Sequence, residues 1–560
     1  MPPPPQRDPR GEAYDPARGR GGRGGVVPGS ARSALVTCAL LAAAAAASGA
    51  SRRPNILCVT CEDISPLITS YGDPAARTPF LDRLAKDGVR FARMFSVSGV
   101  CAPSRAALIS GMYPTAIGAD NMRTHGPGVA GVEPYEAVPP PAVRPFTEYL
   151  RAAGYYTTNN AKTDYQFESP LTAWDENGSN AHWRHRPAGA PFFAVFNLEV
   201  THESQVWRRA DEPLTVDPAR VRLPPYYPDT PVVRRDVARV YSNIELMDRQ
   251  AAALVDEVER AGLANDTVVI FFSDNGGPLP RGKRELLDSG LHVPFIIRLP
   301  GRAHAGTVVE DLVSFVDVPA TILSLAGLQA PAHMQGRAFW GAQKRGPREH
   351  VFAARDRMDE WTDAVRAVRD RRFAYVRNYR PDLPEYQDLA YRRQMPLMRE
   401  LLRLRDAGSL DALQARWFRA TKSPEELYDT EADPHEVRDL AQEPSLRPQL
   451  ERLRAALDGW IRETGDRPGR PERELRESLW PGGSQPRTAA PAVTWSEGEV
   501  RIDCATDGAR MAYQVDGRGL RPDHWLLYTG PFVARQGAVI TTLAHRLGYA
   551  PSGEVRFVVP

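Results

Sequence analysis

The sequence predicts an α/β fold in which a parallel or mixed β-sheet is covered by helices on both faces. Three observations lead to this prediction. Short apolar runs, typical of strands buried on both sides, alternate with amphipathic helical patterns through residues 51–345. Several of these runs end directly in polar clusters, and the carboxyl ends of strands are where such sheets bind ligands. The pattern changes beyond residue 345, which indicates smaller domains after the main one.

Five apolar runs have the composition of buried strands: residues 55–61, 154–158, 192–197, 267–272 and 293–298. Three segments between and after them have a helical pattern: residues 78–88, 235–262 and 318–327. In the first helix, Thr78 suits the N-cap, Pro79 suits the first helical position and Gly88 suits the end. The main domain is therefore expected to span residues 51–345.

Three further segments follow the main domain. Residues 346–464 are predicted to form a smaller α+β subdomain, with RRFAYVRNY as a strand and residues 387–407 as a helical region. Residues 465–493 are rich in Pro, Gly and Arg and are expected to be a linker. Residues 494–560 contain VRIDCAT, MAYQV and AVITTLAHR, separated by turn residues, which predicts a small β-sandwich.

The amino-terminal segment, residues 1–50, has the features of a disordered stretch followed by a signal peptide. It begins with Pro, Gly and Arg, which cannot form a core, and continues with an apolar run over residues 34–50 that ends in Ser-Gly-Ala. The run is short and alanine-rich for a membrane span. We therefore expect an exported protein, periplasmic or secreted, without stable membrane insertion; a retained anchor is the alternative. The long basic part leaves open a start downstream of Met1.

Charge and cysteine content exclude some classes of function. Lys+Arg 71 and Asp+Glu 69 leave a formal net charge of +2, which does not favour nucleic acid as a partner. Five cysteines in a chain of this length are too few for a disulfide framework. Cys58 and Cys61 should face opposite sides of one strand as small buried residues, with a redox or zinc CxxC as the alternative.

Four side chains with oxygen ligands follow two of the predicted strands. Glu62 and Asp63 come directly after the first strand, and Asp274 and Asn275 follow the strand at 267–272. Hard oxygen ligands suit Ca²⁺ or Mg²⁺ better than zinc, since no thiolate or imidazole cluster is nearby. Each pair alone is also compatible with an ordinary strand end or turn.

Cys101 opens the stretch CAPSRAALISG, in which Pro103 suits a first helical turn and Gly111 suits its end. A thiol at a helix N-terminus lies beside free backbone N–H groups, which bind anions and lower the thiol pKa. The residue is thus compatible with a thiolate nucleophile, a buried structural cysteine or the precursor of another group. The Cys–Arg loop of cysteine phosphatases has a longer spacer than the three residues between Cys101 and Arg105.

This stretch resembles the signature of type I sulfatases, in which Cys-x-Pro-Ser-Arg begins a helix. In that family a separate formylglycine-generating enzyme oxidises the cysteine to formylglycine. RPNILCVTCED resembles the family's opening strand and metal pair, SDNGG with RGKRELLDSGLHVPFIIRLPG resembles the second metal motif and lysine segment, and PEELYDTEADPHEVRDLA resembles the terminal segment. The resemblance covers about residues 53–460 and implies an alkaline-phosphatase-like mixed sheet sandwiched by helices.

The resemblance implies hydrolysis of a sulfate ester, or of an N-sulfate, through a formylglycine gem-diol nucleophile and Ca²⁺, with Mg²⁺ as the second choice. The implied metal ligands are Glu62, Asp63, Asp274, Asn275 and the modified Cys101. The implied catalytic residues are the modified Cys101, Arg105, Lys162, His202 and Lys283. Arg105 would hold the formylglycine, and the two lysines and the histidine would bind sulfate and serve the leaving group.

Two positions depart from the family pattern. Glu62 stands where many members have Asp. The family often has Gly-Lys-Trp-His around its first lysine, whereas Asp164 replaces the imidazole here. EDISP, GMYPTAIGADNMRT, VTHESQVW and LPRGKR resemble a carbohydrate-sulfatase branch related to heparan N-sulfatases (sulfamidases), which implies a sulfated, glycosaminoglycan-type sugar. Candidate substrate-binding residues, each equally compatible with ordinary surface charge, are Asn121, Arg123, His125, Asp164 and Arg355.

The carboxy-terminal segment resembles the small β-sandwich appended to some glycoside hydrolases, which implies either carbohydrate contact or a passive structural role. Two other functions compete with the sulfatase. One is a phosphoester or phosphonate hydrolase of the same fold. The other is a catalytically inactive protein that binds sulfated glycans, for which the Asp164 departure is the supporting observation.

Overall fold

The computed structural model describes residues 53–125 and 133–560. The predicted disordered stretch and signal peptide, residues 1–50, lie outside the described residues. Among the helices that are described, none is long and apolar enough to cross a membrane.

The centre of the fold is an eight-stranded sheet with the order β4-β3-β5-β1-β6-β7-β2-β8. Its strands are β1 (Asn55–Cys61), β2 (Val89–Phe95), β3 (Tyr156–Asn160), β4 (Glu176–Asn177), β5 (Phe192–Leu198), β6 (Thr267–Ser273), β7 (His292–Arg298) and β8 (Thr307–Ser314). Only β7 runs antiparallel to its neighbours β6 and β2, and the other pairs in this sheet are parallel. The predicted mixed sheet is confirmed.

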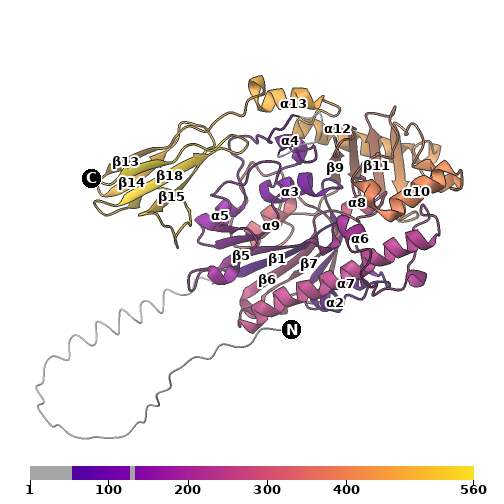
Figure 1. Cartoon of the computed structure of the whole chain (residues 1–560), viewed down its shortest axis with the longest axis horizontal. Coiled ribbons are helices and arrows are strands. Elements are labelled where there is room, and N and C mark those ends of the chain that lie inside the picture. Colours follow the sequence, from indigo (N-terminus) through magenta and orange to yellow (C-terminus); the bar gives the residue numbers. More distant parts are fainter. Residues whose placement is uncertain (1–52, 126–132) are drawn as a thin grey trace, which may run out of the picture. The chain divides into compact units, whose positions relative to one another are not determined.

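Helices cover both faces of this sheet. The helices α2 (Pro79–Lys86) and α7 (Pro231–Arg260) lie on one face, and α3 (Cys101–Ser110), α5 (Thr147–Ala152) and α9 (Asp317–Leu325) lie on the other (Figure 1). Successive residues of β1 accordingly enter different cores: Cys58 packs with the α3 side, and Cys61 packs with the α7 side. Both are buried free thiols, as their spacing predicts.

Two details of the main domain differ from the sequence expectation. β3 begins at Tyr156 rather than at residue 154, because Gly154 has a left-handed φ of 88° and turns the chain after α5. β2 and β8 are strands that the apolar-run criterion missed. β2 mixes buried and part-buried residues, and the first five residues of β8 are part-buried or exposed, so neither is a continuous apolar run.

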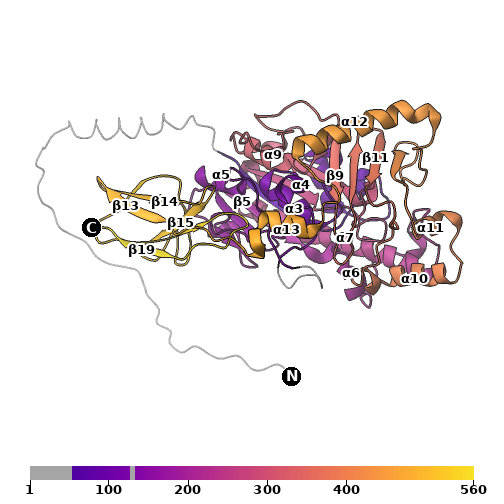
Figure 2. The same ribbon diagram turned by 90° about the horizontal axis from the view of Figure 1, so that it is seen from above.

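The smaller subdomain contains an antiparallel sheet with the order β12-β11-β10-β9. Its strands are β9 (Val351–Arg355), β10 (Val365–Arg369), β11 (Phe373–Asn378) and β12 (Glu425–Asp429). Its helices are α10 (Pro396–Asp406), α11 (Ala412–Arg416) and α12 (Arg447–Thr464), and α12 packs against β10 and β11 (Figure 2). The helix expected over residues 387–407 is shorter, since Pro396 starts α10.

The segment expected to be a linker, residues 465–493, contains a packed helix, α13 (Glu472–Leu479). Leu475 and Trp480 form an apolar cluster with Tyr135 of the main domain. Glu472 accepts hydrogen bonds from the Tyr135 hydroxyl (2.9 Å) and from Arg357 Nε (2.6 Å). The Pro, Gly and Arg content hid this helix, because its single apolar stripe lies between charged residues.

The last segment forms two sheets that face each other, β13-β14-β17 and β16-β15-β18-β19. The strands are β13 (Ala492–Ser496), β14 (Glu499–Asp503), β15 (Arg510–Val515), β16 (Leu526–Leu527), β17 (Phe532–Val533), β18 (Val539–His545) and β19 (Val555–Val558). Val500, Ile502 and Ile540 are among the buried residues between the sheets. This β-sandwich belongs to the same compact unit as the main domain, which runs from Arg53 to Pro560.

Candidate active site

The polar pairs that follow β1 and β6 lie side by side at one edge of the sheet. β1 and β6 are parallel neighbours with Cys61 opposite Ser273, so the next residues of both strands meet. The Asp63 backbone N–H donates to Asp274 Oδ1 (3.3 Å), and Asn275 Nδ2 donates to Asp63 Oδ1 (3.0 Å). Glu62, Asp63, Asp274 and Asn275 are all buried. The structure therefore brings the four predicted oxygen ligands together.

Cys101 is the first residue of α3 and is completely buried. The helix ends at Gly111, whose left-handed φ of 71° suits glycine. Gly99 permits the close approach before the helix, since a Cβ there would lie 2.5 Å from the Glu285 carbonyl oxygen. Burial raises the pKa of the Cys101 thiol to about 12, against the attraction of Lys162. The thiolate favoured by the helix-dipole argument is therefore disfavoured by desolvation.

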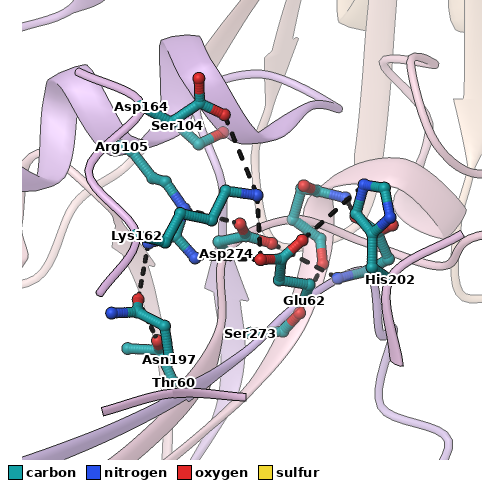
Figure 3. A network of polar contacts seen from close by, with 12 residues as sticks. Thr60, Glu62, Ser104, Arg105, Lys162, Asp164, Asn197, His202, Ser273 and Asp274 are labelled. Atoms are coloured by element: carbon teal, nitrogen blue, oxygen red, sulfur yellow. Dashed lines mark hydrogen bonds and ion pairs between the residues drawn. The ribbon is translucent and has the colours of Figure 1, made fainter. Parts of the chain in front are cut away.

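Arg105 points from α3 into the cluster of oxygen ligands (Figure 3). Its Nε donates to Asp274 Oδ2 (2.9 Å), and its Nη1 donates to Asn197 Oδ1 (2.7 Å). Its Nη2 lies 3.9 Å from Glu62 Oε1 and is a buried donor without a hydrogen-bond partner. Asn197, near the end of β5, was missed by sequence reasoning. The sequence feature that could have pointed to Asn197 was its position at the polar end of a predicted strand.

Lys162 lies between Glu62 and Asp164, as Figure 3 shows. Its Nζ is 2.9 Å from Glu62 Oε1 and 3.9 Å from Asp164 Oδ2. Burial raises the pKa of Asp164, but the charges of Lys162 and Arg123 outweigh it and hold that pKa below its usual value. Asp164 is thus an anion within the group of cations that surrounds Cys101.

Lys283 is buried between two carboxylates. Its Nζ lies 2.7 Å from Asp63 Oδ2 and 3.3 Å from Glu203 Oε1. Glu203 in turn accepts two hydrogen bonds from Arg284 (2.9 and 2.8 Å), and Arg284 also contacts Asp359 (3.0 Å). Glu203, Arg284 and Asp359 were missed by sequence reasoning, because nothing in their local sequence distinguishes them from surface charges.

His202 has a defined tautomer. The Ser204 backbone N–H and hydroxyl lie 3.3 and 2.8 Å from Nδ1, so Nδ1 is the acceptor and Nε2 carries the proton. Nε2 lies 3.8 Å from Glu62 Oε2. Burial, together with the charge of Lys283, lowers the pKa of His202 to about 3. The imidazole is a neutral N–H donor that faces the cluster.

The oxygen cluster fits a hard divalent cation. Asn275 Oδ1 is a buried acceptor without a hydrogen-bond partner, and Glu62 Oε1 has the ion pair with Lys162 but no hydrogen bond of good geometry. Burial raises the pKa of Glu62 to about 7, despite the opposing attraction of Lys162, and Asp274 adds to the increase. A cation would relieve both features. Among the described residues no group of three or more His, Cys, Asp and Glu is spaced to hold a metal directly, and here Lys162 and Lys283 lie against the carboxylates instead.

The predicted substrate-binding residues divide into two groups. Arg123 is exposed and His125 is half-buried. Asn121 is buried, donates to the Tyr135 hydroxyl (2.9 Å) and accepts from the Arg357 backbone N–H (2.9 Å). Arg355 is buried and paired with Glu285 and Asp363. Asn121 and Arg355 are therefore engaged inside the protein rather than brought to the cluster.

Comparison with known proteins agrees with this geometry. The family model described as Sulfatase matches residues 54–328, and the model described as N-sulphoglucosamine sulphohydrolase, C-terminal, matches residues 281–389. An ulvan-active sulfatase of Formosa agariphila is 43% identical over 543 residues, which cover 90% of this chain and 91% of that protein. The chain belongs to the sulfatase family.

Other relatives of this sulfatase include the sulfamidase branch that its motifs resemble. Human N-sulphoglucosamine sulphohydrolase is 28% identical over 74% of this chain and 91% of its own length. Among solved structures, a 2-O GAG sulfatase superimposes with a TM-score of 0.55 at 19% identity, covering 76% of this chain and 96% of the other. The phosphonate monoester hydrolase of Agrobacterium radiobacter superimposes with a TM-score of 0.52 at 17% identity, covering 74% and 96%. These two likenesses show the shared fold.

Proposed function

We propose that this sulfatase removes sulfate from a sulfated polysaccharide, of the ulvan or glycosaminoglycan kind, after export to the periplasm or the medium. The observation that carries the proposal is the group of cationic side chains, Arg105, Lys162 and Lys283, gathered with the four oxygen ligands around Cys101. A sulfate group needs such charges on its oxygens. The similarity to an ulvan-active sulfatase and to N-sulphoglucosamine sulphohydrolase supports the saccharide class.

The proposal includes a Ca²⁺ ion and a formylglycine made from Cys101 by a formylglycine-generating enzyme, with Mg²⁺ as the second choice of metal. Glu62, Asp63, Asp274 and Asn275 would hold the ion, because their buried oxygens lie together and Asn275 Oδ1 has no hydrogen-bond partner. Formylglycine would supply the hydroxyl nucleophile that a buried thiol of raised pKa does not.

Each remaining side chain has a defined task in this proposal. Lys162 and Lys283 are ammonium groups at the carboxylate cluster and would bind sulfate oxygens. His202 carries its proton on Nε2 and would donate a hydrogen bond to the leaving oxygen or nitrogen, while the Lys283 ammonium group would supply the proton that the leaving group takes up. Arg105 is fixed by Asp274 and Asn197 and would orient the modified side chain above it.

Substrate contacts beyond the sulfate are proposed for the accessible members of the predicted set. Arg123 is exposed beside the cluster, and its charge is one of those that hold Asp164 ionised. Arg123 and the half-buried His125 would bind a carboxylate or second sulfate of the sugar, with Asp164 accepting from a hydroxyl. Asn121 would act indirectly, by fixing the Arg357 backbone.

The chemical part of the proposal is tested by mass spectrometry of the peptide that contains residues 101–111. Protein produced together with the modifying enzyme should give a peptide lighter than its cysteine form, and sulfate release should rise with the modified fraction. A Cys101→Ala variant is the matched control and should release no sulfate. Full activity from chains that retain the thiol would contradict the role of formylglycine.

The substrate class is tested by turnover of a defined panel. Ulvan oligosaccharides, glucosamine N-sulfate, O-sulfated glycosaminoglycan disaccharides and a phosphonate monoester would be compared by kcat/KM. The fold shared with a phosphonate monoester hydrolase makes phosphonate cleavage the second candidate activity. Preference for the phosphonate would replace the proposal, and glycan binding without release of sulfate would favour an inactive binding protein. Export is tested by measuring sulfatase activity in the cytoplasmic, periplasmic and medium fractions of producing cells, and activity in the last two is expected.

A further inference from the structure

Three consecutive residues, Asp175 and the two that form β4, hold β3 in place. Asp175 Oδ2 accepts from the Thr157 backbone N–H (2.7 Å) and from the Thr157 hydroxyl (3.1 Å). Glu176 Oε1 accepts from the Tyr156 hydroxyl (2.9 Å). Asn177 Oδ1 accepts from Asn159 Nδ2 (2.8 Å). The side chains of this segment therefore fix β3 along most of its length.

The β-sandwich contributes to this support from the other end of the chain. His524 Nε2 donates to Asp175 Oδ1 (2.9 Å), and both side chains are buried. Arg151 donates to the same Asp175 oxygen through Nε (3.1 Å) and to the Trp525 carbonyl through Nη2 (2.7 Å). Arg521 pairs with Glu176. Asp175 thus accepts hydrogen bonds from β3 through Oδ2 and from the β-sandwich through Oδ1.

His524 is preset for this contact. The Leu520 backbone N–H donates to its Nδ1 (3.1 Å), which leaves the proton on Nε2, facing Asp175. Gln514 Nε2 donates to the His524 carbonyl (3.1 Å). Gly519 allows the imidazole to sit there, because a Cβ at that position would lie 2.5 Å from His524 Nδ1. Local structure in the β-sandwich therefore selects both the position and the tautomer of the ring.

The carboxyl end of β3 leads directly into the candidate active site. Asn159 Nδ2 donates to the Lys162 carbonyl (3.1 Å), and Asn159 Oδ1 accepts from Asn197 Nδ2 (3.0 Å). Asn197 in turn accepts from Arg105. A shift of β3 along its axis would thus move the Lys162 ammonium group and loosen the hydrogen bond that fixes Arg105.

We propose that His524 of the β-sandwich is a positioning residue for sulfate cleavage, acting through Asp175 and β3 on Lys162 and Arg105. The β-sandwich is then a working part of the active-site scaffold and not only an appended module. The effect of His524 on catalysis rests on the proposed sulfate-binding role of Lys162. The effect of His524 on the position of β3 is independent of that role.

Another ion pair between the same two parts of the chain provides a matched control. Arg510 Nε donates to Glu148 Oε2 (3.0 Å), and the Glu148 carboxylate is completely buried. Glu148 lies on α5, and its carboxylate also accepts a hydrogen bond from the Thr172 hydroxyl, so the Arg510–Glu148 pair makes no hydrogen bond to β3. Loss of Arg510 weakens docking of the β-sandwich without releasing Thr157.

The experiment compares full-length His524→Ala, His524→Gln and Arg510→Ala sulfatases. In His524→Ala we expect kcat to fall roughly tenfold with little change in KM, because small misplacement of catalytic groups is costly. His524→Gln keeps a side-chain N–H for Asp175 and should recover most of the loss. Arg510→Ala should keep the kcat of the parent, although its unfolding midpoint falls. Equal losses of kcat in His524→Ala and Arg510→Ala would mean that kcat depends only on how stably the β-sandwich docks. That result would overturn the inference.

Hydrogen exchange gives a readout that does not depend on activity. Amides of residues 156–162 should exchange faster in His524→Ala and at the parent rate in Arg510→Ala. Unchanged exchange in His524→Ala would overturn the inference even if kcat fell. Faster exchange with an unchanged kcat would also overturn it, while leaving the sulfatase proposal intact. A parent protein inactive on every sulfated substrate would refute the proposed function instead.

Discussion

The Lys283 ammonium nitrogen lies 2.7 Å from Asp63 Oδ2, and both side chains are buried. Glu203 Oε1 lies 3.3 Å from the same nitrogen, so one lysine serves two carboxylates. Charge balance in the site therefore depends on Lys283 as well as on any bound cation. Loss of this lysine should affect both the stability of the fold and the release of sulfate.

Replacing Lys283 with Met should lower the free energy of unfolding by about 3 kcal/mol, because a buried carboxylate would lose its partner. Sulfate release should fall at least a hundredfold as a charge at the sulfate is removed. Urea unfolding and initial rates measure the two effects. Arg403→Met is the control: that arginine pairs with Glu400 at the surface, and its loss should change stability by less than about 0.5 kcal/mol. Similar stability losses in both variants would contradict the assigned burial.

Removal of calcium should abolish activity and lower the unfolding temperature. Without the ion, the buried Asn275 Oδ1 has no hydrogen-bond partner, Glu62 Oε1 depends on its ion pair with Lys162, and the carboxylates repel one another. Dialysis against EGTA followed by thermal unfolding measures the effect, and added Ca²⁺ should restore both properties. An Asp274→Asn variant should respond less to Ca²⁺ at the same concentrations. Full activity in protein shown by elemental analysis to be metal-free would refute the metal assignment.

Protonation of His202 should not limit the rate between pH 5 and pH 8. Its pKa is lowered to about 3 by burial and by Lys283, so the ring stays neutral over this range, and a bound cation would lower the pKa further. Ser204→Ala removes the hydroxyl at Nδ1, and kcat should fall several-fold as the Nε2–H tautomer becomes less favoured. The pH profile of kcat/KM for the parent and both Ser204→Ala and His202→Gln checks this. An acidic limb near pH 6.5 that disappears in His202→Gln would contradict it.

Asp236 should make the sulfatase less stable as pH rises. Burial raises its pKa to about 7, although the Leu397 backbone N–H donates to it at 2.6 Å. A carboxyl whose folded pKa is raised contributes most stability below its unfolded pKa, near 4, and loses it as pH passes about 7. Asp236→Asn keeps an acceptor for Leu397 and should be about 2 kcal/mol more stable than the parent at pH 8, and no more stable at pH 4. Urea unfolding at both pH values measures the difference.

The sequence sufficed for the central part of the site because that part follows from strand ends. Glu62 with Asp63, and Asp274 with Asn275, end neighbouring parallel strands, so the β1–β6 register alone brings them together. Cys101 and Arg105 follow from one helix start. Strands that mix buried and part-buried residues, such as β2, lacked the continuous apolar run on which the prediction depended.

The rest required three-dimensional information. Glu203, Arg284 and Asn197 are fixed by partners far away in sequence, and no local pattern marks them. Proximity to the signature helix suggested Asn121 as a substrate contact, but its amide is used inside the protein by Tyr135 and Arg357. The helix α13 was hidden because charged residues flank its apolar stripe.

The contacts of the β-sandwich also determine when the active site can be completed during biosynthesis. His524 meets Asp175 across 349 positions of sequence, and Arg510 meets Glu148 across 362. Contacts of such long range close late, after their loop entropy has been offset. Asp175, which holds β3, therefore acquires its full set of hydrogen bonds only after the final segment of the chain has been synthesised. Premature termination near the carboxyl end should yield chains that retain every signature residue and yet assemble an imprecise catalytic centre.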